Sequence, residues 1–220
     1  MAGLLLATLA RGASVGPAGY TNDFTAWPAA TDWATLSIPG SPGEAYDLDN
    51  DVLTNGLYSA SAISLRLISN SAVAPTLPAQ LTNAVWNAPG GFIQTRPNTT
   101  RATALMGKFV NNTGSNALAV QIDYLLSVPA SAVVEDGGKG THVYYSLSGL
   151  AGSWVALPGL YNTNSTGTNQ LSLNLPLAWA DGASLHLLWV DDNTTTGVDP
   201  ANQMDNFSLT VPSAFQPTLN

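Results

Sequence analysis

The chain contains no cysteine, and this absence excludes both a disulfide scaffold and a metal site built on thiolates. Charged side chains are also scarce, at 9% of the residues against about 25% in an average soluble domain. The folded protein must therefore present a polar but largely neutral surface. Few charges need to be desolvated when such surfaces meet, so this composition favours an exported bacterial protein that packs against copies of itself.

Positive charge is the scarcer of the two signs. Six lysines and arginines stand against 14 acids, which gives a formal net charge of -8. These six residues form no basic patch, so neither nucleic acid nor an anionic membrane surface is expected as a partner.

Long apolar runs are missing as well, since none reaches the roughly 18 residues that a membrane-spanning helix requires. Near the N-terminus, an apolar stretch at residues 3–10 is followed by the small residues Gly12, Ala13 and Ser14. This pattern resembles the second half of a secretory signal peptide that is cleaved after Ser14. The alternative is an extended segment that is retained and inserts into a neighbouring subunit.

These features predict three segments. Residues 1–19 form the partial signal peptide or extended segment, residues 20–212 form one folded domain, and residues 213–220 form a tail. We expect a mature chain without a membrane span that is secreted, either extracellular or on the cell surface.

Catalytic residue types are few. Glu44 and Glu135 are the only glutamates, and both lie in Gly-rich turns, where the carboxylate pair of a glycosidase is hard to assemble. His142 and His186 are the only histidines, and both lie in strand-like patterns. The chain has no G-x-S-x-G elbow, no Gly-rich phosphate loop and no His-rich metal motif. The sequence therefore predicts that the protein is not an enzyme.

What the chain does contain is a series of short alternating apolar segments separated by Gly, Pro and Asn turns. This alternation predicts one strand at residues 61–68. It also predicts a hairpin, with strands at residues 103–110 and 117–128 around a polar turn. Roughly a dozen strands and no helix emerge in this way, without an internal repeat. The sequence predicts an all-β fold, a single-domain antiparallel jelly-roll β-sandwich.

The stretch at residues 184–211 combines a strand that is apolar on both faces, an acidic loop and a closing strand. Calcium takes six to eight oxygen ligands, which carboxylates and Asn carbonyls supply. We therefore predict a structural calcium site whose ligands are Asp191, Asn193, Asp199 and Asp205. The alternative is a solvated turn capped by Asn.

A second acidic pattern, Asp47, Asp49 and Asp51, has the spacing that opens a calcium loop. Val52, however, stands where that loop needs Gly, and the bidentate Glu at the end of the loop is missing. The sequence therefore favours a polar turn here.

Three segments, at residues 101–128, 140–158 and 187–211, resemble a jelly-roll module of secreted bacterial proteins that often carry a C-terminal sorting anchor. The resemblance covers about residues 24–211 and implies a jelly roll and export, with no settled activity. Residues 212–220 depart from it, because they include neither an apolar helix nor a basic tail.

The closing strand adds a second resemblance. Met204, Asp205, Asn206 and Phe207 are similar to the last strand of jelly-roll carbohydrate-binding modules. The acidic loop before them resembles the calcium loop of legume-lectin-like sandwiches, although its spacing differs.

Six tryptophans are available to stack on sugar rings, whose C–H groups meet the negative face of an aromatic ring. Strand alternation places Trp154 and Trp189 in the core. Trp86 and Trp179 lie nearer to turns, and we predict that they are exposed and bind carbohydrate.

Two functions follow from these observations. The first is an exported, non-enzymatic protein with a structural role, which assembles with copies of itself through its edge strands. The alternative is a carbohydrate-binding module, stabilised by calcium, whose partner is a surface polysaccharide.

Overall fold

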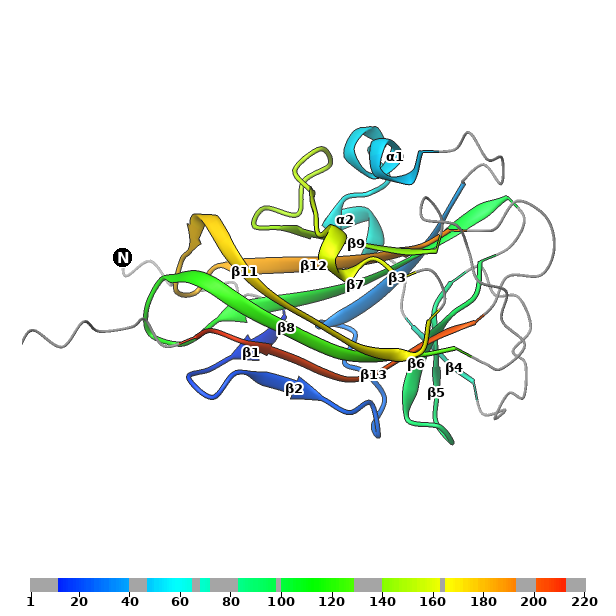
Figure 1. Ribbon diagram of the computed structural model, residues 1–220, viewed down its shortest axis with the longest axis horizontal. Coiled ribbons are helices and arrows are strands. Elements are labelled where there is room, and N and C mark those ends of the chain that lie inside the picture. The colour runs from blue at the N-terminus through cyan, green and yellow to red at the C-terminus, as the bar shows by residue number, and fades with distance from the viewer. Residues whose placement is uncertain are drawn as a thin grey trace, which may run out of the picture.

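The structure is a computed structural model, which describes residues 12–39, 47–64, 68–71, 83–97, 100–128, 140–162, 165–192 and 201–212. Its strands pack face to face as two sheets (Figure 1). Nearly all the pairings are antiparallel, with short parallel exceptions at two sheet edges. The prediction of an all-β, antiparallel jelly-roll sandwich is confirmed.

The first sheet is built around two long central strands. In spatial order it contains β1 (Ala13–Val15), β7 (Arg101–Asn111), β12 (Ser184–Asp191), β9 (Thr141–Ser146) and β10 (Val155–Ala156), while β3 (Trp33–Pro39) also pairs with β7. Ala13 and Val15 are buried in the core, so the predicted cleavage point after Ser14 falls inside a strand of this sheet.

The second sheet continues from a long edge strand toward short ones. Its order is β11 (Gly167–Trp179), β8 (Ala117–Ser127), β13 (Asn202–Thr210), β6 (Phe92–Thr95), β5 (Val85–Asn87) and β4 (Ser69–Ser71). The strand β2 (Tyr20–Asn22) also pairs with β13, beyond the point where β6 ends.

The predicted hairpin at residues 103–110 and 117–128 is wrong. Its two strands are β7 and β8, and they lie in opposite sheets, so that the turn between them crosses the sandwich. The Asn111 side chain stabilises this crossing by donating to the carbonyls of Ser115 and Trp179, both at 2.8 Å. A polar turn between two apolar strands looks the same in sequence whether the strands pair or separate.

An aromatic cluster fills the space between the sheets. The Trp33 ring lies 5.2 Å from the Phe207 ring and 5.9 Å from the Trp189 ring, so residues from both sheets meet. Phe109 stacks on Phe207 from the other side, at 5.2 Å. These side chains are buried together with the inward residues of β8 and β12.

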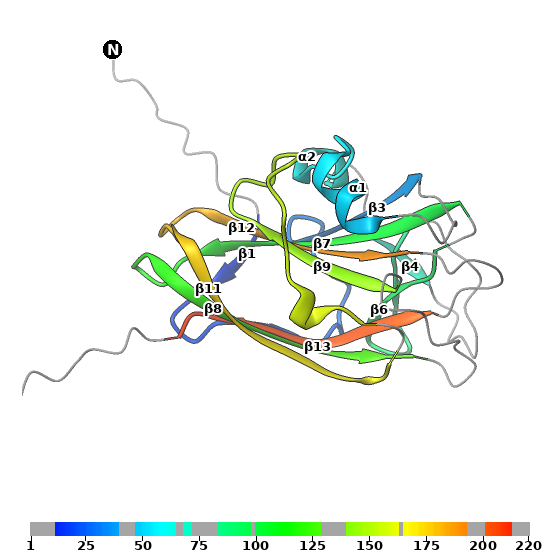
Figure 2. The same cartoon turned by 45° about the horizontal axis from the view of Figure 1, so that its top comes forward.

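The outer face of the first sheet is covered by helices, which the sequence interpretation missed. They are α1 (Leu48–Thr54) and α2 (Ala60–Ile63). A 3-10 turn, η1 (Pro158–Leu160), lies on the inner side instead, where Leu160 is buried in the core between the sheets. Figure 2 shows α1 and α2 lying over this sheet, on the side away from β13. No helix in the described parts of the chain is long and apolar enough to cross a membrane.

The helix α1 replaces the polar turn predicted at residues 47–51. Asp47 caps it by accepting from the Asn50 amide at 3.0 Å, while Leu48 and Val52, four residues apart, are buried on one face. The strand predicted at residues 61–68 is wrong at its start, because Ala60–Ile63 form α2 behind the capping residue Ser59, while residues 65–67 lie outside the described ranges. Both helices bury apolar residues against the outward residues of β7 and β12, which explains why these strands are apolar on both faces.

Candidate functional site

A surface groove opens where β13 changes partners. It has a volume of about 330 Å³ and is lined by Thr21, Asn22 and Asp23 from the end of β2 and by Asn206, Phe207 and Ser208 from β13. This volume lies within the range of small-ligand sites, which begins at about 300 Å³. We call it the β13 groove.

An irregularity in β13 creates the β13 groove. The pairing of β13 with β8 shifts register between Asp205 and Ser208, and Asn206 adopts a positive φ of 49°. Asn tolerates this conformation better than most residues do. The Asp205 carboxylate holds the bend by accepting from the Asn206 backbone N–H at 2.6 Å and from its Nδ2 at 3.1 Å.

Two carboxylates make the rim of the β13 groove acidic. Asp23 accepts from the hydroxyl of Thr25 at 2.8 Å and from its backbone N–H at 3.1 Å, and these hydrogen bonds lower the pKa of Asp23. Burial raises the pKa of Asp205, the Asn206 backbone N–H opposes that effect, and the charge of Asp23 adds to it. Such a rim accepts hydrogen bonds from hydroxyl groups or attracts a cation.

Polar side chains continue from the β13 groove across the outer face of the second sheet. Asp123 on β8 lies between Ser208 on β13 and Gln170 on β11, each its direct cross-strand partner. Its carboxylate accepts from Gln121 at 3.2 Å, from Ser208 at 3.4 Å and from Gln170. We call Gln121, Asp123, Gln170 and Ser208 the polar strip.

The loop that leaves the β13 groove carries an exposed tryptophan. Trp27 is 55% exposed, yet its position is fixed: its ring stacks on that of Trp86 at 5.8 Å, and its Nε1 donates to the Ile68 carbonyl at 3.2 Å. Trp27 follows Asp23 by four positions in the chain, so their Cα atoms are at most roughly 14 Å apart. The sequence interpretation did not select Trp27, although its place before Pro28 in a loop between strands was a usable signal.

The predicted exposure of Trp86 and Trp179 is wrong. Their exposed fractions are 8% and 1%. Both indole N–H groups are satisfied by backbone carbonyls, Trp86 by Phe24 at 2.7 Å and Trp179 by Ala183 at 3.0 Å, which permits burial. Trp86 contributes to the surface only indirectly, as the layer beneath Trp27.

The predicted calcium ligands do not converge in the part of the chain that the structure describes. Asn193 and Asp199 lie outside the described residues, and Asp205 lies beside the β13 groove. Within the described ranges, no group of three or more His, Cys, Asp or Glu side chains could hold a metal ion. The calcium site therefore stays a prediction.

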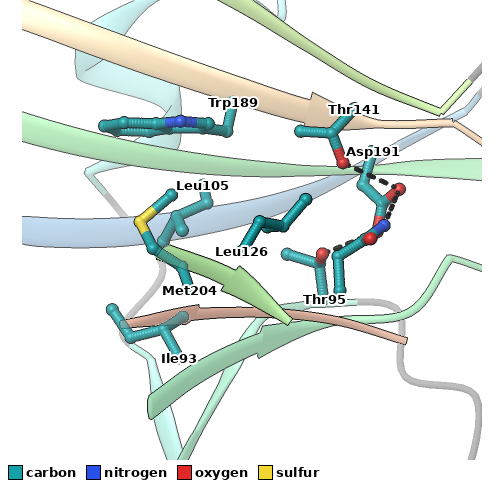
Figure 3. A pocket seen from close by; sticks show the side chains of 9 residues that line it. Ile93, Thr95, Leu105, Leu126, Thr141, Trp189, Asp191 and Met204 are labelled. Carbon is teal, nitrogen blue, oxygen red and sulfur yellow. Dashed lines mark hydrogen bonds between the residues drawn. The ribbon is translucent and has the colours of Figure 1, made fainter. Parts of the chain in front are cut away.

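Asp191 instead lies at the end of β12 and is buried between the sheets. Figure 3 shows its carboxylate facing Thr95 and Thr141. It accepts hydrogen bonds from Thr95 at 2.6 Å, from Asn202 at 2.9 Å and from Thr141 at 3.4 Å. The adjoining cavity is about 10 Å³, which is at most the space of one water molecule. Asp191 links the two sheets here through hydrogen bonds.

A second polar cluster joins α1 to the first sheet. The Oδ1 atom of Asp49 receives the hydroxyl groups of Tyr144 and Tyr161, both at 2.6 Å, and lies 2.9 Å from Nδ1 of His142. The His142 ring stacks on that of Tyr161 at 3.8 Å, and its Nε2 is buried. An Asp–His pair is part of a hydrolytic triad. Among the described residues, His142 contacts Asp49, Tyr144 and Tyr161, and these contacts dock α1 onto the first sheet.

No family model matches the chain, and no curated protein matches it. Among solved structures, it is similar to TmCBM61 in complex with beta-1,4-galactotriose, with 9% identity over 55% of this chain and 70% of that chain and a TM-score of 0.33. It is also similar to the enzymatically active domain of tailspike protein 4 from bacteriophage CBA120, with 8% identity over 83% of this chain and 20% of that chain and a TM-score of 0.39.

A third similar structure is an isomalto-dextranase from Arthrobacter globiformis T6 complexed with panose, with 15% identity over 54% of this chain and 18% of that chain and a TM-score of 0.28. The chain thus spans about a fifth of the tailspike and isomalto-dextranase chains. At TM-scores this low, none of the three carries an argument about activity. The class of the protein rests on its own topology, which is that of an antiparallel jelly-roll sandwich.

Proposed function

We propose that the protein is a non-enzymatic, exported glycan-binding β-sandwich. In this proposal a surface polysaccharide lies along the β13 groove and stacks on Trp27. The observation that carries the proposal is that Trp27 is more than half exposed and yet held in place. Export is supported by the neutral surface that follows from 9% charged residues.

The geometry of Trp27 suits a sugar ring. An aromatic ring that is already fixed loses little conformational entropy when a ligand stacks on it. The stacking on Trp86 and the hydrogen bond to Ile68 provide this fixation from below and from the edge. The outer ring face remains available for the C–H groups of a pyranose.

The side chains of the β13 groove suit sugar hydroxyl groups. The Asp23 carboxylate in the lining accepts hydrogen bonds, as does that of Asp205 beside the groove, while Asn206 and Ser208 can both donate and accept. These are uncharged or anionic groups, so the groove favours a neutral polysaccharide over an acidic one. The polar strip extends the same chemistry toward β11.

Binding is favoured over hydrolysis because the β13 groove is open. Asp23 is fully exposed, and Asp205 is only partly buried. A glycosidase holds its two carboxylates on either side of the scissile bond and keeps one of them protonated. Release of reducing ends from a bound polysaccharide would contradict the non-enzymatic part of the proposal.

The test is a glycan array followed by calorimetry of the best neutral oligosaccharide. We expect Trp27→Ala to weaken binding at least tenfold, or about 1.4 kcal/mol, and Asp23→Asn to weaken it as well. The matched control is Leu118→Ala, which removes a 68% exposed apolar side chain from β8. Unchanged affinity of the Trp27→Ala variant, or no neutral ligand on the array, would overturn the proposal.

A structural, self-assembling role is the second candidate, and β11 favours it. This strand of 13 residues contains no charged side chain and pairs, within the described residues, only with β8. A long edge strand without charges can pair with another copy, and β11 is regular up to Asn174, before the irregular stretch that contains Pro176. Copies of the chain would then join edge to edge at β11.

Light scattering over a range of protein concentrations tests this candidate. We expect the wild-type chain to form oligomers and the double variant Thr168→Lys and Ser172→Lys to be monomeric. Both side chains are exposed on β11, so the substitutions place two positive charges on the strand that would pair. Thr25→Lys, on an exposed loop, is the control for added charge. A wild-type chain that stays monomeric at the highest concentration argues against assembly and leaves glycan binding unaffected.

A further inference from the structure

A second groove lies on the other sheet, between β12, α2 and the loop that follows β9. Its volume is about 350 Å³, and its polar lining consists of Lys108, His186, Ser61, Ser64, Ser148 and Ser184. We call it the Lys108 groove. It is separate from the β13 groove, which belongs to the second sheet.

Strand register brings the two basic side chains together. Lys108 on β7 and His186 on β12 are direct antiparallel partners, and Ser184 lies two residues from His186 on the same face. The opposite wall is held in place by the Ala60 amide, which donates to the Gly149 carbonyl at 2.8 Å. A side chain at Gly149 would collide with Ala60 and with the His186 ring, so glycine keeps this wall close to the histidine.

Among the described residues that line the Lys108 groove, Lys108 is the only fully charged group, and none carries a carboxylate. Across the described ranges, no ion pair joins Lys108 to an acid. Its stem packs close to Gly12, where an added Cβ would lie 3.0 Å from the Lys108 Cγ. A half-buried lysine with no acidic partner among the described residues is unusual in a chain whose net charge is -8.

Hydroxyl groups complete the lining. The side chains of Ser64 and Ser184 make no hydrogen bond to any described residue and can turn toward a ligand. The His186 Nδ1 faces the Ser146 carbonyl at 3.3 Å, which fixes the ring. A positive charge surrounded by hydroxyl donors, with no carboxylate among the described lining residues, is an arrangement that can bind an oxyanion.

We infer that the Lys108 groove binds an oxyanion, of the carboxylate or sulfate type that acidic polysaccharides carry. This site is independent of the glycan site at Trp27. It lies on the opposite sheet and would prefer acidic groups of a ligand. Lys108 supplies the charge, and the serine hydroxyls supply neutral hydrogen bonds.

The two histidines make a direct test possible, because the chain has no others. Burial and the charge of Lys108 lower the pKa of His186 to about 4, and an anion bound beside it must raise that value. Imidazole NMR signals are followed while sodium sulfate or sodium glucuronate is added, against sodium chloride at matched ionic strength. His142, on another part of the sheet, is the internal control.

We expect a saturable shift of the His186 signals and a rise in its pKa of about one unit, with His142 unchanged. A response to sulfate alone assigns a sulfate ester, and a response to glucuronate alone assigns a uronic acid. Lys108→Met should abolish the response, and Lys108→Arg should retain it. The inference fails if neither anion gives a saturable shift, or if Lys108→Met responds like the wild type.

The same variants separate this inference from the proposed function. Lys108→Met should bind the neutral oligosaccharide normally, and Trp27→Ala should respond normally to the anion. Urea denaturation of each variant verifies that the fold is intact.

Discussion

At the scale of single residues, Asp49 is the best example of a side chain whose partners come from distant parts of the chain. It lies on α1, and its Oδ1 gathers hydrogen bonds from Tyr144 on β9 and from Tyr161 after η1, with His142 beside them. Burial and the Asp49 charge raise the pKa of both tyrosines, which stay protonated donors. The carboxylate therefore fastens the helical layer to the first sheet.

We predict that Asp49→Asn lowers the free energy of unfolding at pH 7 by about 1–2 kcal/mol. The loss is no larger because the Asp49 side chain is 40% exposed, so that solvent screens its interactions. Burial alone would raise the pKa of Asp49, but hydrogen bonds from Tyr144, Tyr161 and His142 outweigh it, and the net pKa is lowered. The stabilisation is thus complete above the unfolded-state pKa of about 3.9 and is lost as pH falls through the folded-state value.

Urea denaturation of both proteins at pH 7 and at pH 3 measures this difference. The gap between wild type and Asp49→Asn should narrow at the lower pH. Tyr161→Phe, which removes one donor to the same oxygen, should show a smaller loss at pH 7. A gap that is constant over this range would show that the Asp49 charge does not stabilise the fold.

At the scale of elements, the docking of α2 depends on a close approach to the loop after β9. Gly149 has a φ of 66°, and an added Cβ would lie 2.6 Å from that of Ala60. Residues other than glycine meet both a steric clash and an unfavourable left-handed backbone here. The short helix α2 can therefore pack on this loop only because the loop carries glycine.

We predict that Gly149→Ala destabilises the protein by about 2–4 kcal/mol, from overpacking added to backbone strain. Gly114→Ala is the matched control, because Gly114 also has a positive φ, of 82°, but has open space around it. The control should lose only about 1–2 kcal/mol. Thermal unfolding of the two variants compares them directly, and equal losses would show that the contact with Ala60 can relax.

At the scale of the whole molecule, the two sheets are held together by the aromatic cluster that both contribute. Phe207 on β13 contacts Trp33 and Trp189 of the first sheet edge to face, at 5.2 and 5.8 Å. It is 1% exposed. Removing this ring opens a cavity at the centre of the sandwich, where neighbouring rings from two rigid sheets cannot collapse to fill it.

Phe207→Ala should therefore cost about 3–5 kcal/mol of unfolding free energy. Leu118→Ala, at a 68% exposed position on β8, should change it by at most about 0.5 kcal/mol. Chemical denaturation followed by tryptophan fluorescence provides the measurement. A small loss at Phe207 would mean that the sheets repack around the missing ring.

Strand alternation was sufficient to predict the sandwich and the burial of Trp189 on β12, because side chains on a strand alternate between faces whatever their partner is. Trp154 is buried as predicted, but it precedes β10 and is buried by packing with Tyr58, to whose carbonyl its Nε1 donates. The same information could not tell that β7 and β8 belong to opposite sheets. It also placed Trp86 and Trp179 at the surface, because nearness to a turn says little about what packs over a ring.

The candidate site was predicted only in part. Asp205 was singled out as a metal ligand, and the structure places it beside the β13 groove next to Asn206. Its partners from β2 and the exposed ring of Trp27 were not predicted, because they approach β13 from about 180 residues earlier in the chain. Lys108 and His186 were likewise brought together only by the register of β7 and β12.

The sequence by itself determined the class of fold and the nature of the surface. Both depend on local alternation and on composition, which need no knowledge of contacts between distant residues. Only the tertiary structure decided which tryptophan is exposed, where helices cover the first sheet, and which polar side chains share a groove. These properties depend on which segments pack over a residue, and in a sandwich most of those segments are far away in sequence.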